Sequence, residues 1–472
     1  LRTATSTQLT VPNVPGTPTF SNITSSAMRV SWTAPTGGAT SYKVERCTGA
    51  ACSDYASLAT GVTDLFYDDS GLSQGTTYRY RVRATNATGD GLYSGGAEQA
   101  TAANPPTVTT DAESSVTAST ATLNGNITAT GGADATVRGF AYSTNSALSS
   151  GVSTTTNNGT FSTGTFGEGV SSLTGNTVYY YRAYATNTGG TGYGSIELFL
   201  TYPSAPDSPG YSATTATTTG ISWSEASGGA STYELTQCVG VSCSVFGSIG
   251  SNSTTTYSLA GNTTYSYAVR GNNATGFGAF SATTTRLTLP DVPGTPTFSS
   301  VTASAMRVSW SAPTGDAATY KLERCAGASC SDYASVATGI AALFYDDSGL
   351  SGGTVYRYRV RATNATGDGL YSGGAEQTTA VGAPSVTTSA ASSVLQQTAT
   401  LNGSVSATGG GTVTSRGFAW GTSATLESGA ATTTETGSFG TGAFIYALDS
   451  LAQSTTHYFR AYATNSAGTT LG

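Results

Sequence analysis

Six cysteines are the residues with the clearest capacity for chemistry, and they form three pairs with one common spacing. The pairs are Cys47 and Cys52, Cys238 and Cys243, and Cys325 and Cys330. Each pair lies between two short strand-like runs, so a disulfide within the pair would close a tight hairpin. Disulfides persist in oxidising compartments, and the spacing therefore predicts an extracellular protein. A zinc site is the alternative, but each pair offers only two thiols and has no histidine beside it, so we expect no metal.

A Tyr-Asp-Asp-Ser-Gly motif occurs twice, at residues 67–71 and 345–349, and its paired carboxylates could bind calcium. Calcium needs further oxygen ligands, and no third aspartate follows either copy at the spacing of a calcium-binding loop. We therefore expect a turn at the end of a strand, where aspartate, serine and glycine are common.

A stripe of alternating arginines, Arg79, Arg81 and Arg83, is repeated at residues 357–361 and could bind an acidic polysaccharide. The preferred interpretation is a solvated sheet face, on which a neighbouring strand offers Glu45. Glycan is therefore kept as an alternative partner of this surface.

The sequence offers little for catalysis. Its one histidine, His457, replaces a tyrosine of an internal repeat and is expected to pack against its neighbours. No nucleophile with a matched base, glycine-rich phosphate loop or cleft of paired carboxylates can be recognised. We therefore expect neither enzyme activity nor a cofactor.

Composition limits the class of protein further. The net charge is −7 and only 10% of residues are charged, which does not fit the basic surface of a nucleic-acid-binding protein. No run of about 18 apolar residues occurs, so membrane insertion is not expected. The 60 glycines could indicate disorder, but 27 tyrosines and 15 phenylalanines at regular spacing can give every strand an apolar face.

A repeated phrase sets the organisation of the chain. In residues 72–86, a leucine and a short polar turn precede Tyr78, after which apolar and polar residues alternate. This period of two predicts a half-buried strand with Tyr78, Tyr80 and Val82 on its inner face. A leucine and tyrosine at this spacing form the tyrosine corner of immunoglobulin-like sandwiches, in which the hydroxyl bonds back to the turn. The predicted corners are Leu72 and Tyr78, Leu173 and Tyr179, Leu259 and Tyr265, Leu350 and Tyr356, and Leu451 and His457.

The copies repeat in a longer unit. The interval between Trp32 and Trp310 equals that between Leu123 and Leu401, so domains A, B and C are followed by second copies of A and B. The predicted divisions are residues 1–11 as an orphan last strand, 12–103 (A), 104–203 (B), 204–290 (C), 291–381 (second A) and 382–472 (second B).

Domains A and C resemble fibronectin type III modules. They share a proline-rich entry (residues 14–16), a tryptophan in the second strand (Trp32) and an Ala-Thr-Asn strand ending (residues 84–86). The B domains resemble the fibronectin type III-like repeats of bacterial surface proteins through Arg-Gly-Phe-Ala and Tyr-Arg-Ala-Tyr-Ala-Thr-Asn. The resemblance implies an all-β chain of five tandem, seven-stranded Greek-key sandwiches. It does not settle the function, because such modules serve as spacers, adhesives and scaffolds.

Short proline-bearing linkers predict a semi-rigid rod of roughly 150 Å, and the two ends of the sequence suggest how such rods could join. Residues 1–13 match 279–291, which end the last strand of domain C. Gly472 aligns with Gly194, just before the last strand of domain B. The second B domain is therefore expected to lack its last strand and to have an open groove.

Two interpretations of this groove are open. In the first, the sequence is a window of a longer repetitive chain. In the second, residues 1–11 enter the groove of another copy and build a head-to-tail filament, similar to donor-strand exchange in bacterial pili. The donated strand would then present on its inner face Leu1, Thr3, Thr5, Thr7, Leu9 and Val11.

The leading functional hypothesis is a structural subunit or segment of an extracellular filament or cell-surface fibre, whose partner is another copy of itself. The alternatives are a cell-surface adhesin stalk that binds glycan and a spacer of a secreted polysaccharide-degrading enzyme. Glycosylation is a further hypothesis, since the sequence holds acceptor motifs. These lie at Asn22, Asn86, Asn126, Asn158, Asn252, Asn262, Asn273, Asn364 and Asn402.

Overall fold

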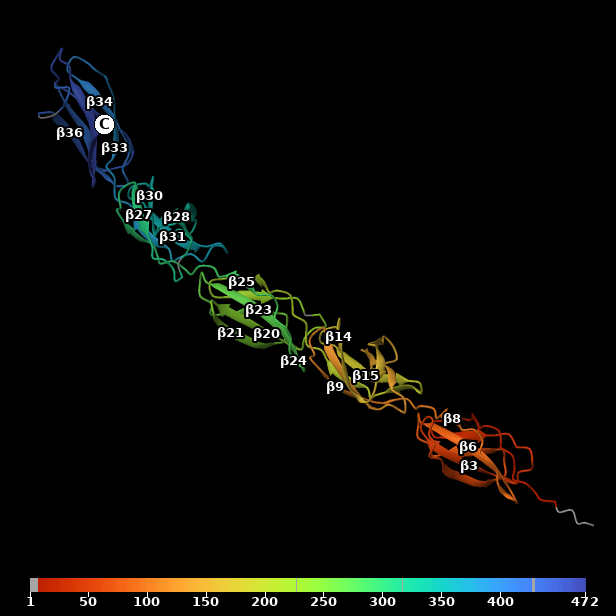
Figure 1. The fold of residues 1–472 in the computed structure, drawn as a ribbon. Helices are drawn as coiled ribbons and strands as arrows, with labels where there is room; N and C mark the ends of the chain where they lie inside the picture. Colours follow the sequence, from red (N-terminus) through yellow and green to blue (C-terminus); the bar gives the residue numbers. More distant parts are fainter. Residues whose placement is uncertain (1–6, 226, 316, 427–428) are drawn as a thin grey trace, which may run out of the picture.

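The computed structural model describes residues 7–225, 227–315, 317–426 and 429–472. Every helix or strand assigned in these ranges is a β-strand, which confirms the predicted all-β class. Figure 1 shows sandwich-like bodies that follow one another in sequence order, so the chain is an extended rod. Each body pairs a three-stranded sheet with a second sheet and encloses its own hydrophobic cluster. We number these five bodies the first to fifth sandwich, in sequence order.

The first and fourth sandwiches share one topology, as their repeated sequences require. In the first, the sheet β1-β2-β5 faces β4-β3-β6-β7, and β8 also pairs with β6. In the fourth, β26-β27-β30 faces β29-β28-β31-β32. The first comprises β1 (Thr19–Ser21), β2 (Ala27–Ser31), β3 (Ser41–Thr48), β4 (Ala56–Val62), β5 (Phe66–Ser70), β6 (Thr77–Asn86), β7 (Gly89–Asp90) and β8 (Ala97–Ala100). The fourth comprises β26 (Thr297–Ser299), β27 (Ala305–Ser309), β28 (Thr319–Ala326), β29 (Ala334–Ile340), β30 (Phe344–Ser348), β31 (Val355–Thr363) and β32 (Ala375–Thr378).

The second and fifth sandwiches form another related pair. In the second, β14-β10-β9 faces β12-β11-β15-β16, with β13 on β11 and β17 on β15. In the fifth, β33-β34-β37 faces β36-β35-β38-β39. The second comprises β9 (Thr107–Ser114), β10 (Ala121–Ala129), β11 (Ala135–Ser143), β12 (Ser153–Thr154), β13 (Asn157–Phe161), β14 (Gly164–Val170), β15 (Val178–Asn187), β16 (Gly190–Tyr193) and β17 (Glu197–Leu200). The fifth comprises β33 (Ser385–Ser392), β34 (Ala399–Ala407), β35 (Val413–Gly421), β36 (Ala431–Phe439), β37 (Gly442–Leu448), β38 (Tyr458–Asn465) and β39 (Gly468–Leu471).

The third sandwich resembles the first in its sheets. Its sheet β18-β19-β22 faces β21-β20-β23-β24, with β25 on β23. It comprises β18 (Gly210–Ser212), β19 (Thr219–Ser222), β20 (Thr232–Val239), β21 (Ser242–Ile249), β22 (Ser253–Thr256), β23 (Thr264–Asn273), β24 (Gly276–Phe277) and β25 (Thr284–Leu287).

The alternation read from the sequence sets the core. Along β6 every second side chain is buried, beginning with Tyr78 and Tyr80, while the arginines between them are half-buried on the outer face. Trp32 packs edge-on against Tyr42 from the opposite sheet, with ring centroids 5.4 Å apart. Aromatic pairs of this kind add to the free energy of burial, so each sandwich is held by a small aromatic core. In the described part of the chain, no helix capable of spanning a bilayer is present.

Candidate functional site

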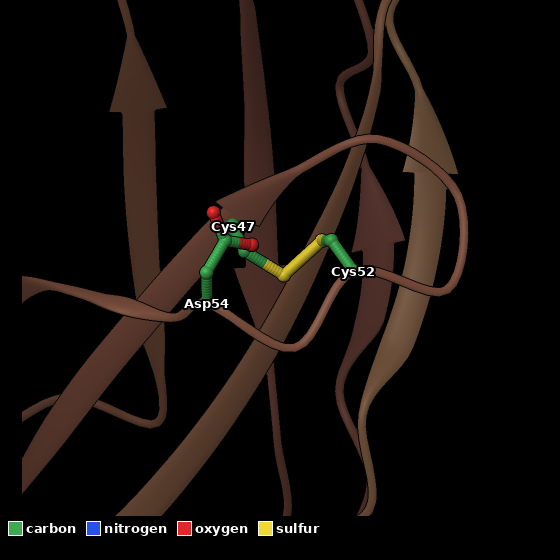
Figure 2. A group of neighbouring side chains, drawn as sticks. All are labelled: Cys47, Cys52 and Asp54. Atoms are coloured by element: carbon green, nitrogen blue, oxygen red, sulfur yellow. A yellow bond between two sulfur atoms is a disulfide. The ribbon is translucent and has the colours of Figure 1, made fainter.

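The cysteines form the three local disulfides that the spacing predicts. Cys47 bonds Cys52, Cys238 bonds Cys243 and Cys325 bonds Cys330. Figure 2 shows that Asp54 lies beside the first disulfide, and its carboxylate is within 4.8 Å of both sulfur atoms. Metal coordination by cysteine requires the thiolate, and a disulfide supplies none. The geometry therefore serves to close a hairpin.

The arginine stripe is engaged in ion pairs along its own sheet. Arg81 bonds Glu45 at 2.6 Å, Arg83 bonds Asp90 at 2.8 Å, and the fourth sandwich repeats both pairs. Burial by itself raises the pKa of Glu45, but hydrogen bonds from Tyr93 and Arg81 outweigh it and leave the pKa below its ordinary value. Positive charge that is already paired attracts an acidic polysaccharide less, so this arrangement favours the solvated-sheet interpretation.

The paired aspartates lie within strand β5 and not in a turn after it, which corrects the sequence-based expectation. Because side chains alternate along a strand, Asp68 points outward to Arg29 at 2.7 Å, while Asp69 is 2% exposed. Asp69 accepts hydrogen bonds from Arg46 Nη1 at 2.8 Å and from Tyr80 Oη at 2.7 Å. The two carboxylates thus face opposite ways and cannot share one calcium ion. Sequence reasoning missed this buried cluster, although an aspartate on the inner face of a strand is the signal for it.

Four of the five predicted corner residues make one and the same hydrogen bond. In the first sandwich, the amide of Ser73 donates to Tyr78 Oη at 2.9 Å. The equivalent amides bond Tyr179, Tyr265 and Tyr356 at 2.8 to 3.0 Å. His457 makes no such bond, and both of its ring nitrogens are shielded from solvent without a described partner.

Four buried threonines end the sandwiches, and the sequence did not draw attention to them. They are Thr101, Thr201, Thr288 and Thr379. In the second sandwich, Thr201 Oγ1 donates to the carbonyl oxygen of Thr174 at 2.7 Å and accepts from the amide of Thr177 at 2.9 Å. The other three make equivalent bonds in their own sandwiches. Each threonine therefore ties the end of its sandwich to the turn before the corner tyrosine.

The backbone of the same threonine contacts the next sandwich. Asn273 of the third sandwich donates from Nδ2 to the carbonyl oxygen of Thr201 at 2.9 Å and to Asn176 Oδ1 at 2.8 Å. In the next joint, Asn364 donates to the carbonyl oxygen of Thr288 at 2.8 Å. One amide side chain thus fixes two successive sandwiches to each other.

Glycines let neighbouring sandwiches touch through their backbones. A Cβ atom placed on Gly75 would lie 1.8 Å from the carbonyl oxygen of Gly132 in the next sandwich. A Cβ atom on Gly228 would lie 1.9 Å from the carbonyl oxygen of Gly175. Only glycine allows this approach, so the joints are closely packed contacts in addition to the proline-bearing linkers.

Residues 9 and 10 lie against the first sandwich in the manner of these joints. Asn86 Nδ2 donates to the carbonyl oxygen of Thr10 at 2.8 Å, and Thr88 Oγ1 donates to that of Leu9 at 3.0 Å. Thr10 therefore takes the place that Thr201 has at the next-but-one sandwich boundary, except that its side chain is exposed.

This register differs from the one predicted for a donor strand. It puts Thr10 on the face that is buried at other joints, whereas the prediction put Leu9 and Val11 there. Leu9 is 56% exposed and Val11 is 45% exposed. Of the other predicted donor residues, Thr7 is exposed, and Leu1, Thr3 and Thr5 lie outside the described residues.

The second sandwich shows what its last strand contributes. Strand β17 pairs with the first half of β15 and brings Phe199 opposite Tyr179. Phe199 is 2% exposed and stacks on Tyr179 at 5.7 Å, with the ring of Tyr181 at 5.8 Å. One strand therefore closes this end of the core.

The fifth sandwich has a cavity of about 390 Å³ at the equivalent place, which agrees with the predicted groove. Within the described residues no strand pairs with the segment before β38, and that strand begins only at Tyr458. Residues that line the cavity include Trp420, Leu448, His457 and Phe459. Trp420, expected in the core, is only partly buried against it.

Comparison with known proteins agrees with this architecture. A model of the fibronectin type III domain matches residues 13–99 and 291–378. The chain is 46% identical to "Chitinase 63" of Streptomyces plicatus over 81 residues, and 45% identical to "Chitinase C" of Streptomyces lividans over 75 residues. These matches cover 17% and 16% of this chain, and only 12% and 11% of the length of those relatives.

Two solved structures are also similar. The FN1-FN3 domains of chicken CNTN1 are 18% identical, with a TM-score of 0.27 over 59% of this chain and 99% of that one. A two-domain fibronectin type III segment of chicken tenascin is 18% identical, with a TM-score of 0.27 over 37% of this chain and 99% of that one. Residues 13–99 and 291–378 are fibronectin type III domains, and the chain is a tandem fibronectin type III repeat protein.

Proposed function

We propose that this chain is a non-catalytic structural rod of an extracellular fibre. The observation that carries the proposal is the repeated joint, in which an asparagine side chain bridges two sandwiches where their backbones touch. Such joints restrict bending, and a rod that resists bending is useful for spanning distance.

An extracellular setting is supported by the three disulfides, because short-range disulfides of this kind persist where thiols are oxidised. A cell-surface location is part of the same proposal. Mass spectrometry of material isolated from its native source, with free thiols alkylated before reduction, would test it. Free thiols at all six cysteines would contradict the extracellular assignment.

Small-angle X-ray scattering and negative-stain microscopy of residues 1–472 test the rod itself. We expect a stiff particle with a length on the order of 150 Å. A compact or freely bending particle would contradict the proposal.

A spacer of a secreted polysaccharide-degrading enzyme is the second candidate, and the similarity to two chitinases over about 80 residues favours it. A spacer stays as single rods at every protein concentration, whereas a fibre subunit assembles. Microscopy across a concentration series distinguishes the two. Co-sedimentation with chitin and with an acidic polysaccharide tests the adhesin alternative, for which the paired arginines offer little free charge.

The fibre form of the proposal includes head-to-tail linkage, with residues 1–11 of one copy filling the cavity of the fifth sandwich in another. Deletion of residues 1–11 should abolish assembly and leave a rod of unchanged stiffness. Filaments that form equally well after the deletion would remove strand donation from the proposal.

A further inference from the structure

The described chain has five threonines in the same backbone setting but only four sandwiches closed by one. Thr101, Thr201, Thr288 and Thr379 are buried and bonded to the turn of their own sandwich. The fifth, Thr10, has the backbone contact to the sandwich that follows it, but its side chain is exposed.

The fifth sandwich has the complementary gap. Counting from the corner leucine, Ala452 corresponds to Thr174 and Thr455 corresponds to Thr177, which are the partners of Thr201. In the described residues, neither the Ala452 carbonyl nor the Thr455 amide has a threonine side chain against it.

We propose that the fifth sandwich binds the strand ending at Thr10 of a second copy, in the register set by Thr10. Thr10 Oγ1 donates to the Ala452 carbonyl and accepts from the Thr455 amide. Its carbonyl stays bonded to Asn86 of its own first sandwich, so the contact between copies has the form of the joints inside the chain. This inference rests on the fibre form of the proposed function and names its partner and its register.

The register also places Gln8 opposite His457. In the second sandwich the equivalent pair is Phe199 opposite Tyr179. His457 has two shielded ring nitrogens without a described partner, and a glutamine amide can both donate to and accept from an imidazole. Glutamine is already found at this strand position in the first sandwich, where Gln99 lies opposite Tyr78.

Sedimentation velocity of the full chain over a range of concentrations tests the proposal. The wild-type chain should form linear multimers whose axial repeat is one chain length. Thr10→Val keeps the shape of the side chain but removes its hydroxyl, and should weaken association by about tenfold. Thr10→Ser keeps the hydroxyl and is the matched control, with association close to that of the wild type. Because the Thr10 side chain is exposed in the single chain, neither change should alter its thermal unfolding.

A double-mutant cycle tests the register separately. Gln8→Phe and His457→Tyr together recreate the pair of the second sandwich, so the double variant should associate more tightly than the sum of the single effects predicts. Additive effects would overturn the register.

A peptide of residues 195–202 serves as a competitor, because it contains the strand that fills the second sandwich. It should bind the full chain with one-to-one stoichiometry and cap the multimers. A stiff rod that stays monomeric at all concentrations, or association that Thr10→Val leaves unchanged, would overturn the inference while leaving the rod function intact. Peptide binding without association of the chains would likewise exclude a second copy as the occupant.

Discussion

Asn364 Nδ2 lies 2.8 Å from the carbonyl oxygen of Thr288, and this hydrogen bond joins the fourth sandwich to the third. The same amide nitrogen lies 2.8 Å from Asn262 Oδ1, while Asn364 Oδ1 accepts from the amides of Thr366 and Gly367 within its own turn. One side chain therefore shapes a turn with its oxygen and a joint with its nitrogen.

Asn364→Asp separates these two roles. The carboxylate keeps the oxygen that caps the turn but removes the amide donor, so the sandwich should stay folded while the joint loosens. Distances between spin labels on the third and fourth sandwiches should spread over a wider range than in the wild type. Asn402→Asp lies within the fifth sandwich, away from any joint, and is the control; an unchanged distribution for Asn364→Asp would contradict the role assigned to the amide.

Asp69 should be far more important for stability than its neighbour Asp68. Replacing Asp69 with alanine leaves the Arg46 guanidinium and the Tyr80 hydroxyl unpaired, and should cost about 3 kcal/mol of unfolding free energy. Asp68→Ala removes only an exposed ion pair and should change little. Urea unfolding of the two variants provides the comparison, and similar losses for both would show that burial of Asp69 is not decisive.

Acid should weaken the first and fourth sandwiches through Glu45 and Glu323. The pKa of each carboxyl lies below its ordinary value of 4.5, so the unfolded chain binds more protons than the folded chain as the pH falls. The resulting stabilisation is present above about pH 5 and is lost as the pH passes through the lowered pKa. Urea unfolding at pH 7 and at lower pH measures this dependence, which should shrink in the variant carrying both Glu45→Gln and Glu323→Gln. Glu98→Gln with Glu376→Gln is the control, and an equal reduction there would show that the effect is not specific.

Removing a disulfide should cost little stability. The bridged cysteines are only five positions apart, so each bond restricts the unfolded chain over a short loop and contributes about 2 kcal/mol. Replacing Cys47 and Cys52 with serine should lower the thermal midpoint of the first sandwich slightly and leave the circular dichroism spectrum unchanged. Global unfolding of the variant would show that the bond holds the whole sandwich and not only the hairpin.

Glycan attachment should depend on the joints. In the acceptor motifs at Asn86 and Asn273, the side-chain nitrogen that would carry a sugar donates a joint hydrogen bond, and both residues are buried. Asn22, Asn158 and Asn252 are exposed. Glycopeptide mass spectrometry after expression in a glycosylating host should find sugar confined to such exposed positions. Full occupancy at Asn273 would be inconsistent with a closed joint.

The sequence by itself determined the local features of this protein. Alternation around Tyr78 specifies a half-buried strand, because successive side chains of a strand face opposite sides. Equal cysteine spacing specifies local disulfides, because a short loop brings its own ends together. The repeat of Trp32 at Trp310 specifies two sandwiches of one kind.

Tertiary structure decided whatever depends on which groups meet across long separations. Asp68 and Asp69 are identical in type, and only the packing of two sheets makes one an exposed partner and the other a buried acceptor. Thr10 and Thr201 have similar neighbours in sequence, yet one is exposed and the other buried, because burial requires a sandwich on both sides of the strand. Joint geometry belongs to this class as well, since Gly75 reveals its need for glycine only once Gly132 lies against it.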